Sequence, residues 1–152
     1  GLQATILDLP GTLGIARESL AVSQYRDRIR LRRGNYHRCD LGREEYDLIL
    51  TSHITHHEGV SFNQELMRRC RAALKKYGRL VVHDFMTDQS RTAPLFSAIF
   101  SAHMLVTSRE GRTYSAGDYE TWLRRAGFKK MERKPIGSGS TNPTEIIIAT
   151  KC

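Results

Sequence analysis

The sequence predicts a doubly wound α/β domain with a mostly parallel sheet, and three observations support this prediction. Strand-like and helix-like patterns alternate along the 152 residues, which is typical of βαβ units. Short apolar runs stop at polar residues, as buried strands do where they reach the ligand-binding edge of a parallel sheet. The last two strand-like runs, 128–133 and 144–150, are joined by a short loop that suits an antiparallel hairpin at the sheet edge.

The first part of the chain contains three strand-like runs and one helix-like run. Residues 4–7 form a short apolar run, which predicts a buried parallel strand. Apolar residues at spacings of three and four predict a helix over about 12–23. Residues 28–33 alternate apolar side chains with arginines and predict an edge strand that ends at Gly34. Residues 46–51 predict a second buried strand.

The second part continues the alternation. Residues 62–77 have a strongly amphipathic pattern and predict a helix that Gly78 stops. Residues 79–85 predict a third apolar strand, and residues 92–105 predict a further helix.

A last helix is predicted over 115–126 from its end signals. Ser115 is the expected N-cap, and Asp118 lies three residues further on, as in a capping box. Gly127 is the expected stop.

Composition and charge restrict the function classes. The chain has 24 Lys plus Arg against 16 Asp plus Glu, which gives a net charge of +8. The basic residues are scattered along helices and strands, which favours solvated faces over a nucleic-acid surface. Three cysteines without CxxC spacing favour a reducing, cytoplasmic setting. No apolar run approaches the roughly 18 residues of a membrane span, and the first residues do not resemble a signal peptide.

Candidate ligand-binding residues follow the first two predicted strands. Asp8 ends the first strand, where a carboxylate accepts hydrogen bonds from the two hydroxyls of a ribose; an ordinary loop acid is the alternative. Gly34, Asn35 and Tyr36 follow the next strand, where an amide suits a purine edge and an aromatic ring suits stacking. An ordinary turn is the alternative for these three residues.

Three of the six histidines, His53, His56 and His57, lie within five residues after the predicted strand 46–51. They have three interpretations: a general base, a metal site, or loop histidines without a role. Adjacent histidines diverge, and the order does not match a His-Glu-x-x-His zinc motif, so the metal reading is the weakest.

Large apolar side chains surround the next strand end. Phe85 and Met86, with Phe100, His103 and Met104, either line a pocket for an aromatic substrate or form plain core.

Taken in order, these segments resemble the S-adenosylmethionine-dependent small-molecule O-methyltransferases, a family that includes plant phenol and hydroxyindole enzymes and bacterial natural-product enzymes. The resemblance covers nearly the whole chain, in segments 6–10, 26–36, 46–57, 79–85 and 111–128.

The resemblance implies a class I methyltransferase, Rossmann-like fold and a set of roles. His56 takes the place of the general base that deprotonates the substrate hydroxyl, and Asp84 that of an acid that supports it. No metal is implied. The implied residues for S-adenosyl-L-methionine are Asp8, Leu9, Asn35, Tyr36 and Ser52.

Four departures from the family pattern qualify these roles. Asn35 replaces a usual Asp, and His53 stands where bacterial relatives often have Asn. Thr113 falls near the place of a second acid of the plant enzymes, so this acid is not found. The glycine-rich cofactor loop is not found. The resemblance therefore implies that residues 1–152 are the C-terminal part of the catalytic domain. It also implies that three elements of the family lie outside this chain: the first strand, the first helix and an N-terminal dimerisation domain. The missing strand would lie between the strands at 4–7 and 46–51.

The expected function is methyl transfer to a hydroxyl of a small, aromatic or polyketide-like metabolite by a cytoplasmic homodimer that binds neither membrane nor nucleic acid. One alternative is an RNA methyltransferase, which the +8 charge suggests, although no base-flipping Asn-Pro-Pro-aromatic segment is present. The other is a non-catalytic, methyltransferase-like fragment that binds a partner through uncovered strand edges.

Overall fold

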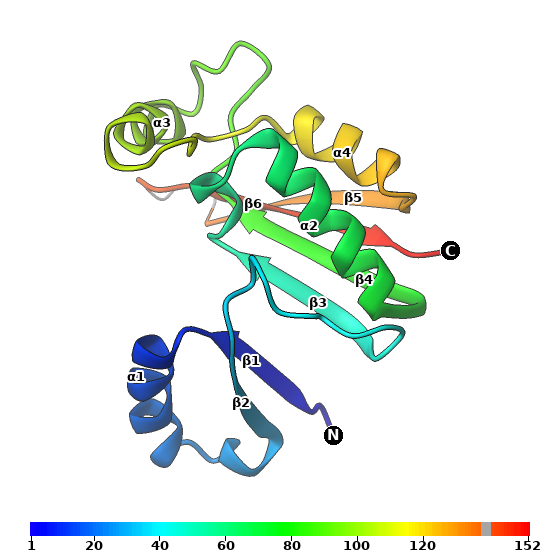
Figure 1. Cartoon of the computed structure of the whole chain (residues 1–152). Coiled ribbons are helices and arrows are strands. Elements are labelled where there is room, and N and C mark those ends of the chain that lie inside the picture. Colours follow the sequence, from blue (N-terminus) through cyan, green and yellow to red (C-terminus); the bar gives the residue numbers. More distant parts are fainter. Residues whose placement is uncertain (138–140) are drawn as a thin grey trace. The chain divides into compact units, whose positions relative to one another are not determined.

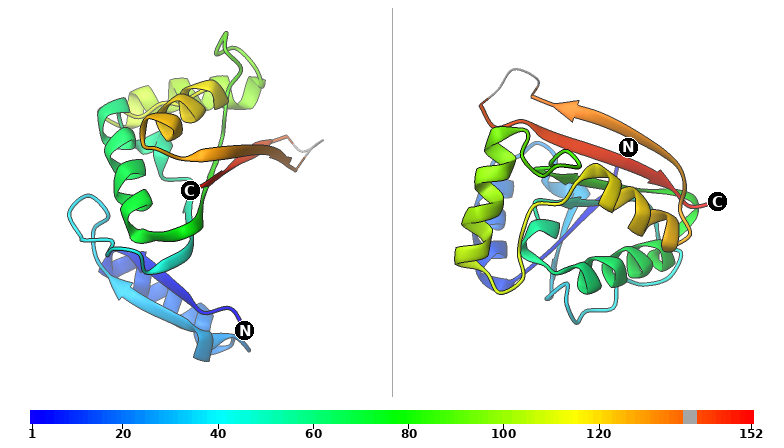
Figure 2. Two further views of the ribbon diagram at one scale, coloured as in Figure 1. Left: turned by 90° about the vertical axis from the view of Figure 1, so that its right-hand side faces the viewer. Right: turned by 90° about the horizontal axis from the view of Figure 1, so that it is seen from above.

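The computed structural model describes residues 1–137 and 141–152, and it confirms the predicted α/β order of elements. Contacts divide the chain into two compact units, residues 1–41 and 42–152, and each is described by itself. Figure 1 labels the elements, and Figure 2 gives two further views. Among the described residues, no helix combines the length and apolar character needed to cross a membrane.

The first unit is one β-α-β arrangement. Its elements are β1 (Ala4–Asp8), α1 (Pro10–Ala21), a short 3-10 helix (Arg26–Arg28) and β2 (Ile29–Arg33). The strands β1 and β2 are parallel, with Asp8 aligned to Arg33, so both strands end at the same edge. The helix begins two residues before the expected position because Pro10 occupies its first turn, where a missing N–H costs nothing.

The second unit is a four-stranded sheet with helices. Its strands follow the order β3-β4-β6-β5, with β3 and β4 parallel and the remaining pairs antiparallel. Its elements are β3 (Tyr46–Ser52), a 3-10 helix η2 (Thr55–His57), α2 (Val60–Ala73), β4 (Leu74–Asp84), α3 (Leu95–Thr107), α4 (Ala116–Arg125), β5 (Lys129–Ile136) and β6 (Thr144–Thr150).

The core of the second unit lies between the sheet and two helices. Helix α2 packs against β4, helix α4 packs against β5 and β6, and the two helices contact each other (Figure 1). The fully buried side chains of this layer include Met67, Leu80, Tyr119, Leu123 and Ile147. The predicted C-terminal hairpin is confirmed as β5 and β6, which run side by side in Figures 1 and 2. Residues 138–140 of its expected loop lie outside the described residues.

The expectation of two fully buried strands is wrong for β1 and β3. Ile6 is 36% exposed, and Leu48 and Leu50 are 53% and 56% exposed. Within the described residues, β1 pairs only with β2, and β3 pairs only with β4. Each is therefore an edge strand, and its side chains lack the neighbours that would cover them.

The predicted helix end at Gly78 is also wrong, because α2 ends at Ala73 and residues 74–78 belong to β4. The backbone of this stretch is used in pairing. Tyr77 N–H donates to Lys151 O at 2.7 Å, and Lys151 N–H donates to Gly78 O at 2.9 Å. A side chain at Gly78 would meet the carbonyl oxygen of Lys75 at 2.9 Å, so the glycine serves close packing rather than a helix stop.

The predicted start and stop of α4 are confirmed. The Ser115 hydroxyl accepts the N–H of Asp118 at 3.1 Å, and Ser115 N–H donates to the Asp118 carboxylate at 2.9 Å. Gly127 follows the helix with a φ of +91°, a conformation that favours glycine.

We expect Ser115→Ala to lower the free energy of unfolding by about 1 kcal/mol, because it removes the buried cap of α4. Urea unfolding monitored by circular dichroism measures this change. Thr121→Ala is the matched control, since it removes an exposed hydroxyl from the same helix and should change the value by less than about 0.5 kcal/mol. Equal losses in the two variants would contradict a capping role.

Candidate active site

The parallel strands β3 and β4 end together and place two histidines of one loop, His53 and His56, beside one carboxylate. Ser52 is aligned with His83, and Asp84 is the last residue of β4. The chain leaves β3 through His53, whose φ of +53° turns the backbone sharply, and forms the short η2 helix that carries His56. A histidine loop and an acidic strand end thus lie at the edge where α/β folds bind ligands.

His56 and Asp84 form a buried, charge-assisted hydrogen bond. His56 Nδ1 lies 2.6 Å from Asp84 Oδ1, and the two side chains are 5% and 0% exposed. An ionised carboxylate only accepts hydrogen bonds, so the proton of a neutral His56 is on Nδ1. The other ring nitrogen, Nε2, then carries the lone pair and is the basic atom.

Asp84 is held by three further donors. Its Oδ2 accepts the Thr55 hydroxyl at 2.5 Å and the backbone N–H of His56 at 3.2 Å, and its Oδ1 accepts the N–H of Phe85 at 2.8 Å. Burial by itself raises the pKa of Asp84, but the hydrogen bonds from His56, Thr55 and Phe85 outweigh burial and hold the pKa below its usual value. Asp84 therefore stays ionised at neutral pH.

The loop that carries His56 is anchored from both sides. The Asn63 amide donates to the carbonyl oxygens of Thr55 at 2.9 Å and Glu58 at 3.2 Å. The Tyr114 hydroxyl donates to Glu58 O at 2.6 Å, and Arg112 N–H donates to His56 O at 2.9 Å. These bonds fix the backbone on both sides of the imidazole, which a reactive side chain requires.

The other two histidines of the loop have different surroundings. His53 Nδ1 is buried without a hydrogen-bond partner among the described residues and lies 3.8 Å from Asp84 Oδ1. Burial lowers the pKa of His53, and the negative charge of Asp84 only partly opposes this. His57 lies at the surface beside His56. Its pKa is lowered mainly by partial burial and, to a smaller extent, by the nearby His56. Both rings are therefore mainly neutral at pH 7.

A metal site is the second interpretation of the histidine loop. One ligand atom each from His53, His56 and Asp84 lie within 4.8 Å of one another. However, both carboxylate oxygens of Asp84 already accept two donors each, and the Nδ1 of His56 is one of those donors. A metal ion would have to replace these hydrogen bonds, so the donor set fits a histidine–aspartate pair better.

Three phenylalanines form an aromatic wall beside His56, consisting of Phe85, Phe96 and Phe100. The ring of Phe85 lies 5.0 Å from that of Phe96 and 4.9 Å from that of Phe100. The rings of His56 and Phe100 pack edge-to-face, with their centres 4.9 Å apart. The predicted pocket residues therefore divide: Phe85 and Phe100 are half-buried beside the imidazole, whereas Met86 and Met104 are core.

Ser52, the fifth predicted cofactor residue, lies in the second unit and contacts a different histidine. Its hydroxyl is 2.9 Å from His83 Nδ1, and His83 Nε2 is 3.0 Å from the hydroxyl of Thr144. The backbone N–H of His53 also donates to His83 O. Ser52 is exposed at the end of β3, one residue before the histidine loop.

The other predicted cofactor residues lie in the first unit, at the ends of β1 and β2. Asp8 Oδ1 accepts the N–H of Leu9 at 2.7 Å, and its backbone oxygen accepts the N–H of Gly34 at 3.0 Å. Leu9 is the N-cap residue that precedes α1, and it is 49% exposed. Asn35 is exposed, and its Oδ1 accepts the N–H of His37, while the half-buried ring of Tyr36 lies 4.6 Å from that of His37. The structure thus brings Asp8 close to the 34–36 turn.

The structure groups the predicted residues within each unit. Asp8, Leu9, Asn35 and Tyr36 share one strand edge of the first unit, and Ser52, His56 and Asp84 share one strand edge of the second. Their roles in binding and catalysis stay predictions.

Sequence reasoning missed four residues that support His56: Thr55, Asn63, Tyr114 and Tyr119. The position of Thr55 inside the histidine loop is the only local signal. Asn63, Tyr114 and Tyr119 come from other parts of the sequence, and Tyr119 looks like an ordinary buried position of an amphipathic helix.

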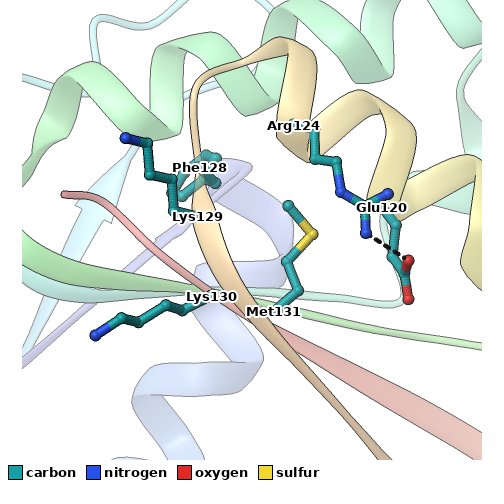
Figure 3. A pocket seen from close by; sticks show the side chains of 6 residues that line it. All are labelled: Glu120, Arg124, Phe128, Lys129, Lys130 and Met131. Carbon is teal, nitrogen blue, oxygen red and sulfur yellow. Dashed lines mark hydrogen bonds and ion pairs between the residues drawn. The ribbon is translucent and has the colours of Figure 1, made fainter.

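Two hollows have linings that include neither His56 nor Asp84. Figure 3 shows one at the end of α4, where Arg124 and Glu120 form an ion pair of 3.1 Å above the start of β5. Its lining consists of Glu120, Arg124, Phe128, Lys129, Lys130 and Met131. The other is lined by His57, Glu58, Arg109 and Glu110. Both are mainly charged and lack the apolar walls of a typical small-molecule pocket.

Comparison with known proteins identifies the family. Residues 1–129 match the O-methyltransferase domain family. The chain is 31% identical over 140 residues to the tetracenomycin polyketide synthesis 8-O-methyl transferase TcmO of Streptomyces glaucescens, a match covering 92% of this chain and 41% of TcmO.

Solved structures of related proteins have a similar fold. The crystal structure of an O-methyltransferase family 2 protein from Planctomyces limnophilus, in complex with apigenin, matches with a TM-score of 0.88 and 28% identity over 99% of this chain and 43% of that one. The structure of PigF with SAH matches with a TM-score of 0.84 and 26% identity over all of this chain and 44% of that one. A methyl transferase named PigF from a Serratia strain is also among the relatives by sequence.

The chain belongs to the O-methyltransferase domain family, because the match spans 129 of its 152 residues. The structural likeness confirms the predicted Rossmann-like methyltransferase fold. The chain spans about two fifths of the length of the relatives that it matches.

We expect Asp84→Asn to lower the free energy of unfolding at pH 7 by about 3 kcal/mol, because it removes the ionised acceptor of a buried, charge-assisted hydrogen bond with His56. The folded-state pKa of Asp84 is lowered, so its contribution is complete above the unfolded pKa of about 4 and disappears as the pH falls through the folded value. Urea unfolding at several pH values should show the difference from wild type shrinking below about pH 4.

The matched control is Asp47→Asn, which removes the exposed half of a surface ion pair with Lys75. It should cost less than about 1 kcal/mol at pH 7. A gap between wild type and Asp84→Asn that does not change with pH would contradict the ionised state of Asp84.

Proposed function

We propose that the protein carrying this chain transfers a methyl group from S-adenosyl-L-methionine to a hydroxyl group of a small aromatic molecule, with His56 as the general base. The single observation that carries this proposal is the buried His56–Asp84 pair beside the aromatic wall. Family membership supports the reaction class, and TcmO, by name an 8-O-methyl transferase of polyketide synthesis, supports the acceptor class.

The chemical task of this chain is to remove a proton. A phenol has a pKa of about 10 and is a poor nucleophile at neutral pH. His56 Nε2 takes the hydroxyl proton, so that the oxygen becomes an effective nucleophile, and the imidazolium that forms is stabilised by ionised Asp84 at 2.6 Å. The proton later leaves His56 for solvent, which restores the neutral base. Bound S-adenosyl-L-methionine supplies an activated methyl group on a positively charged sulfur.

The aromatic wall supports a flat, apolar acceptor. The rings of Phe100 and Phe85 lie 4.9 Å and 6.2 Å from the His56 imidazole, and the ring of Phe96 packs against both of them. Such a wall excludes water from the hydroxyl that reacts, and it places the acceptor by stacking rather than by hydrogen bonds.

The cofactor proposal rests on the strand-end residues of each unit. Asp8 uses Oδ1 for the N–H of Leu9, and its Oδ2 fits the hydroxyls of a ribose. Asn35 Oδ1 accepts the N–H of His37, and its amide N–H groups are donors that suit a purine edge. Tyr36 offers a half-buried ring face, and Ser52 an exposed hydroxyl. The carboxylate of Asp8, the amide of Asn35 and the ring of Tyr36, all in the first unit, fit an adenosine moiety. Ser52 is a separate candidate contact in the second unit.

Two further expectations, a homodimer and a cytoplasmic location for the full-length protein, stay predictions.

We expect His56→Ala in the full-length protein to lower the rate of methyl transfer by about 10²- to 10⁴-fold, because the general base is lost. Affinity for S-adenosyl-L-methionine, measured by calorimetry, should persist. The matched control is His57→Gln, which changes the exposed neighbouring ring and should keep most of the activity. Methyl transfer that survives His56→Ala would refute the proposed base.

We expect Asp8→Asn in the full-length protein to weaken the binding of S-adenosyl-L-methionine by about 10-fold or more, because a carboxylate gives two charged acceptors and an amide only one neutral one. Calorimetry measures the affinity without methyl transfer. Asp27→Asn is the control, since Asp27 is an exposed acid of the same unit. If the two variants bind equally well, Asp8 does not hold the cofactor.

A further inference from the structure

A chain of two hydroxyl groups leads from helix α4 to the carboxylate beside His56. The Thr55 hydroxyl lies 2.5 Å from Asp84 Oδ2 and 2.7 Å from the hydroxyl of Tyr119. An ionised carboxylate has no proton to give, so Thr55 donates to Asp84. Thr55 has only one hydroxyl proton, and Tyr119 must therefore donate to Thr55.

Tyr119 is a permanent donor in this chain. Its side chain is fully buried and packs edge-to-face against the rings of Tyr114 at 6.0 Å and Trp122 at 5.4 Å. Burial raises the pKa of Tyr119 well above its ordinary value, and the charge of Asp84 adds to this effect. The phenol thus keeps its proton at any pH at which an enzyme of this kind works.

The same surroundings make Asp84 dependent on these donors. The titratable groups that interact with it are His53, His56 and His57 of the loop and Tyr119 of α4. Without the Thr55 hydroxyl, Oδ2 would keep only the longer contact with the backbone N–H of His56. A buried carboxylate that loses a donor takes up a proton more readily, and a protonated Asp84 no longer fixes the proton of His56 on Nδ1.

We propose that Thr55 and Tyr119 are positioning residues, which act through Asp84 to keep the proton of His56 on Nδ1 and its Nε2 basic. This inference rests on the proposed role of His56 as general base. Each hydroxyl acts through the next group in the chain that runs from Tyr119 to Thr55 to Asp84.

The test compares Thr55→Val with Thr113→Val in the full-length protein. Thr113 is equally buried, and its hydroxyl donates to Ser97 O away from Asp84, so it matches the loss of a buried hydroxyl. Thr55→Val should raise the pKa of Asp84, measured by carboxyl ¹³C NMR, by about 1. It should also lower kcat by about 10-fold with KM for both substrates nearly unchanged. Thr113→Val should change neither quantity.

Three further variants test the chain of hydroxyl groups itself. Tyr119→Phe should raise the pKa of Asp84 less than Thr55→Val does, and the double variant should match Thr55→Val alone, because Tyr119 acts only through Thr55. Thr55→Ser keeps the hydroxyl and should retain the wild-type pKa and kcat. Tyr119→Phe and Thr55→Ser also test the proposal if Thr55→Val fails to fold.

Equal Asp84 pKa values in Thr55→Val and Thr113→Val would overturn the inference, as would additive effects in the double variant. The NMR titration does not depend on methyl transfer, so it separates two failures. Loss of the proposed function would appear as activity in His56→Ala, whereas loss of this inference alone would appear as an unchanged Asp84 in a protein whose His56 is still essential.

Discussion

The hydrogen bond between His56 and Asp84 is the interaction on which the rest of the second unit depends. Both side chains are buried, and a buried carboxylate is tolerated only where donors replace the lost water. The fold provides those donors from separate sources: the histidine loop, the backbone after β4 and, through Thr55, helix α4. Because these parts must meet at one point, the pair fixes the loop, the strand end and the helix relative to one another.

Each unit contains two parallel strands that end at the same edge of their sheet. Asp8 lies beside Arg33 in one unit, and Ser52 lies beside His83 in the other. Parallel pairing brings residues from distant parts of the sequence to a single edge, and that edge collects polar groups because the sheet hydrogen bonds stop there. In the second unit this edge meets an aromatic wall, so an apolar surface and a basic nitrogen lie side by side.

Features that depend on local pattern could be predicted from the sequence. The order of elements, the C-terminal hairpin and the Ser115–Asp118 capping box all follow from side-chain spacing and end signals. Features that depend on distant partners could not. Residues 74–78 join β4 because Lys151, far along the chain, pairs with their backbone. Tyr119 hydrogen-bonds to Thr55, which lies 64 residues earlier in the sequence. Leu48 is exposed because its burial depends on the strands that flank β3. The place of Asp84 beside His56 was expected only through the family resemblance.

The most direct test of the account is the position of the proton on His56 in the full-length protein at neutral pH, measured by ¹⁵N NMR of the imidazole nitrogens. Because Asp84 is an ionised acceptor 2.6 Å away, we expect the neutral imidazole to carry its proton on Nδ1, in a strong hydrogen bond, and to leave Nε2 without a proton. A neutral imidazole with its proton on Nε2 instead would show that the nitrogen assigned as the base has no lone pair to offer, and it would rule out His56 as a base oriented by Asp84.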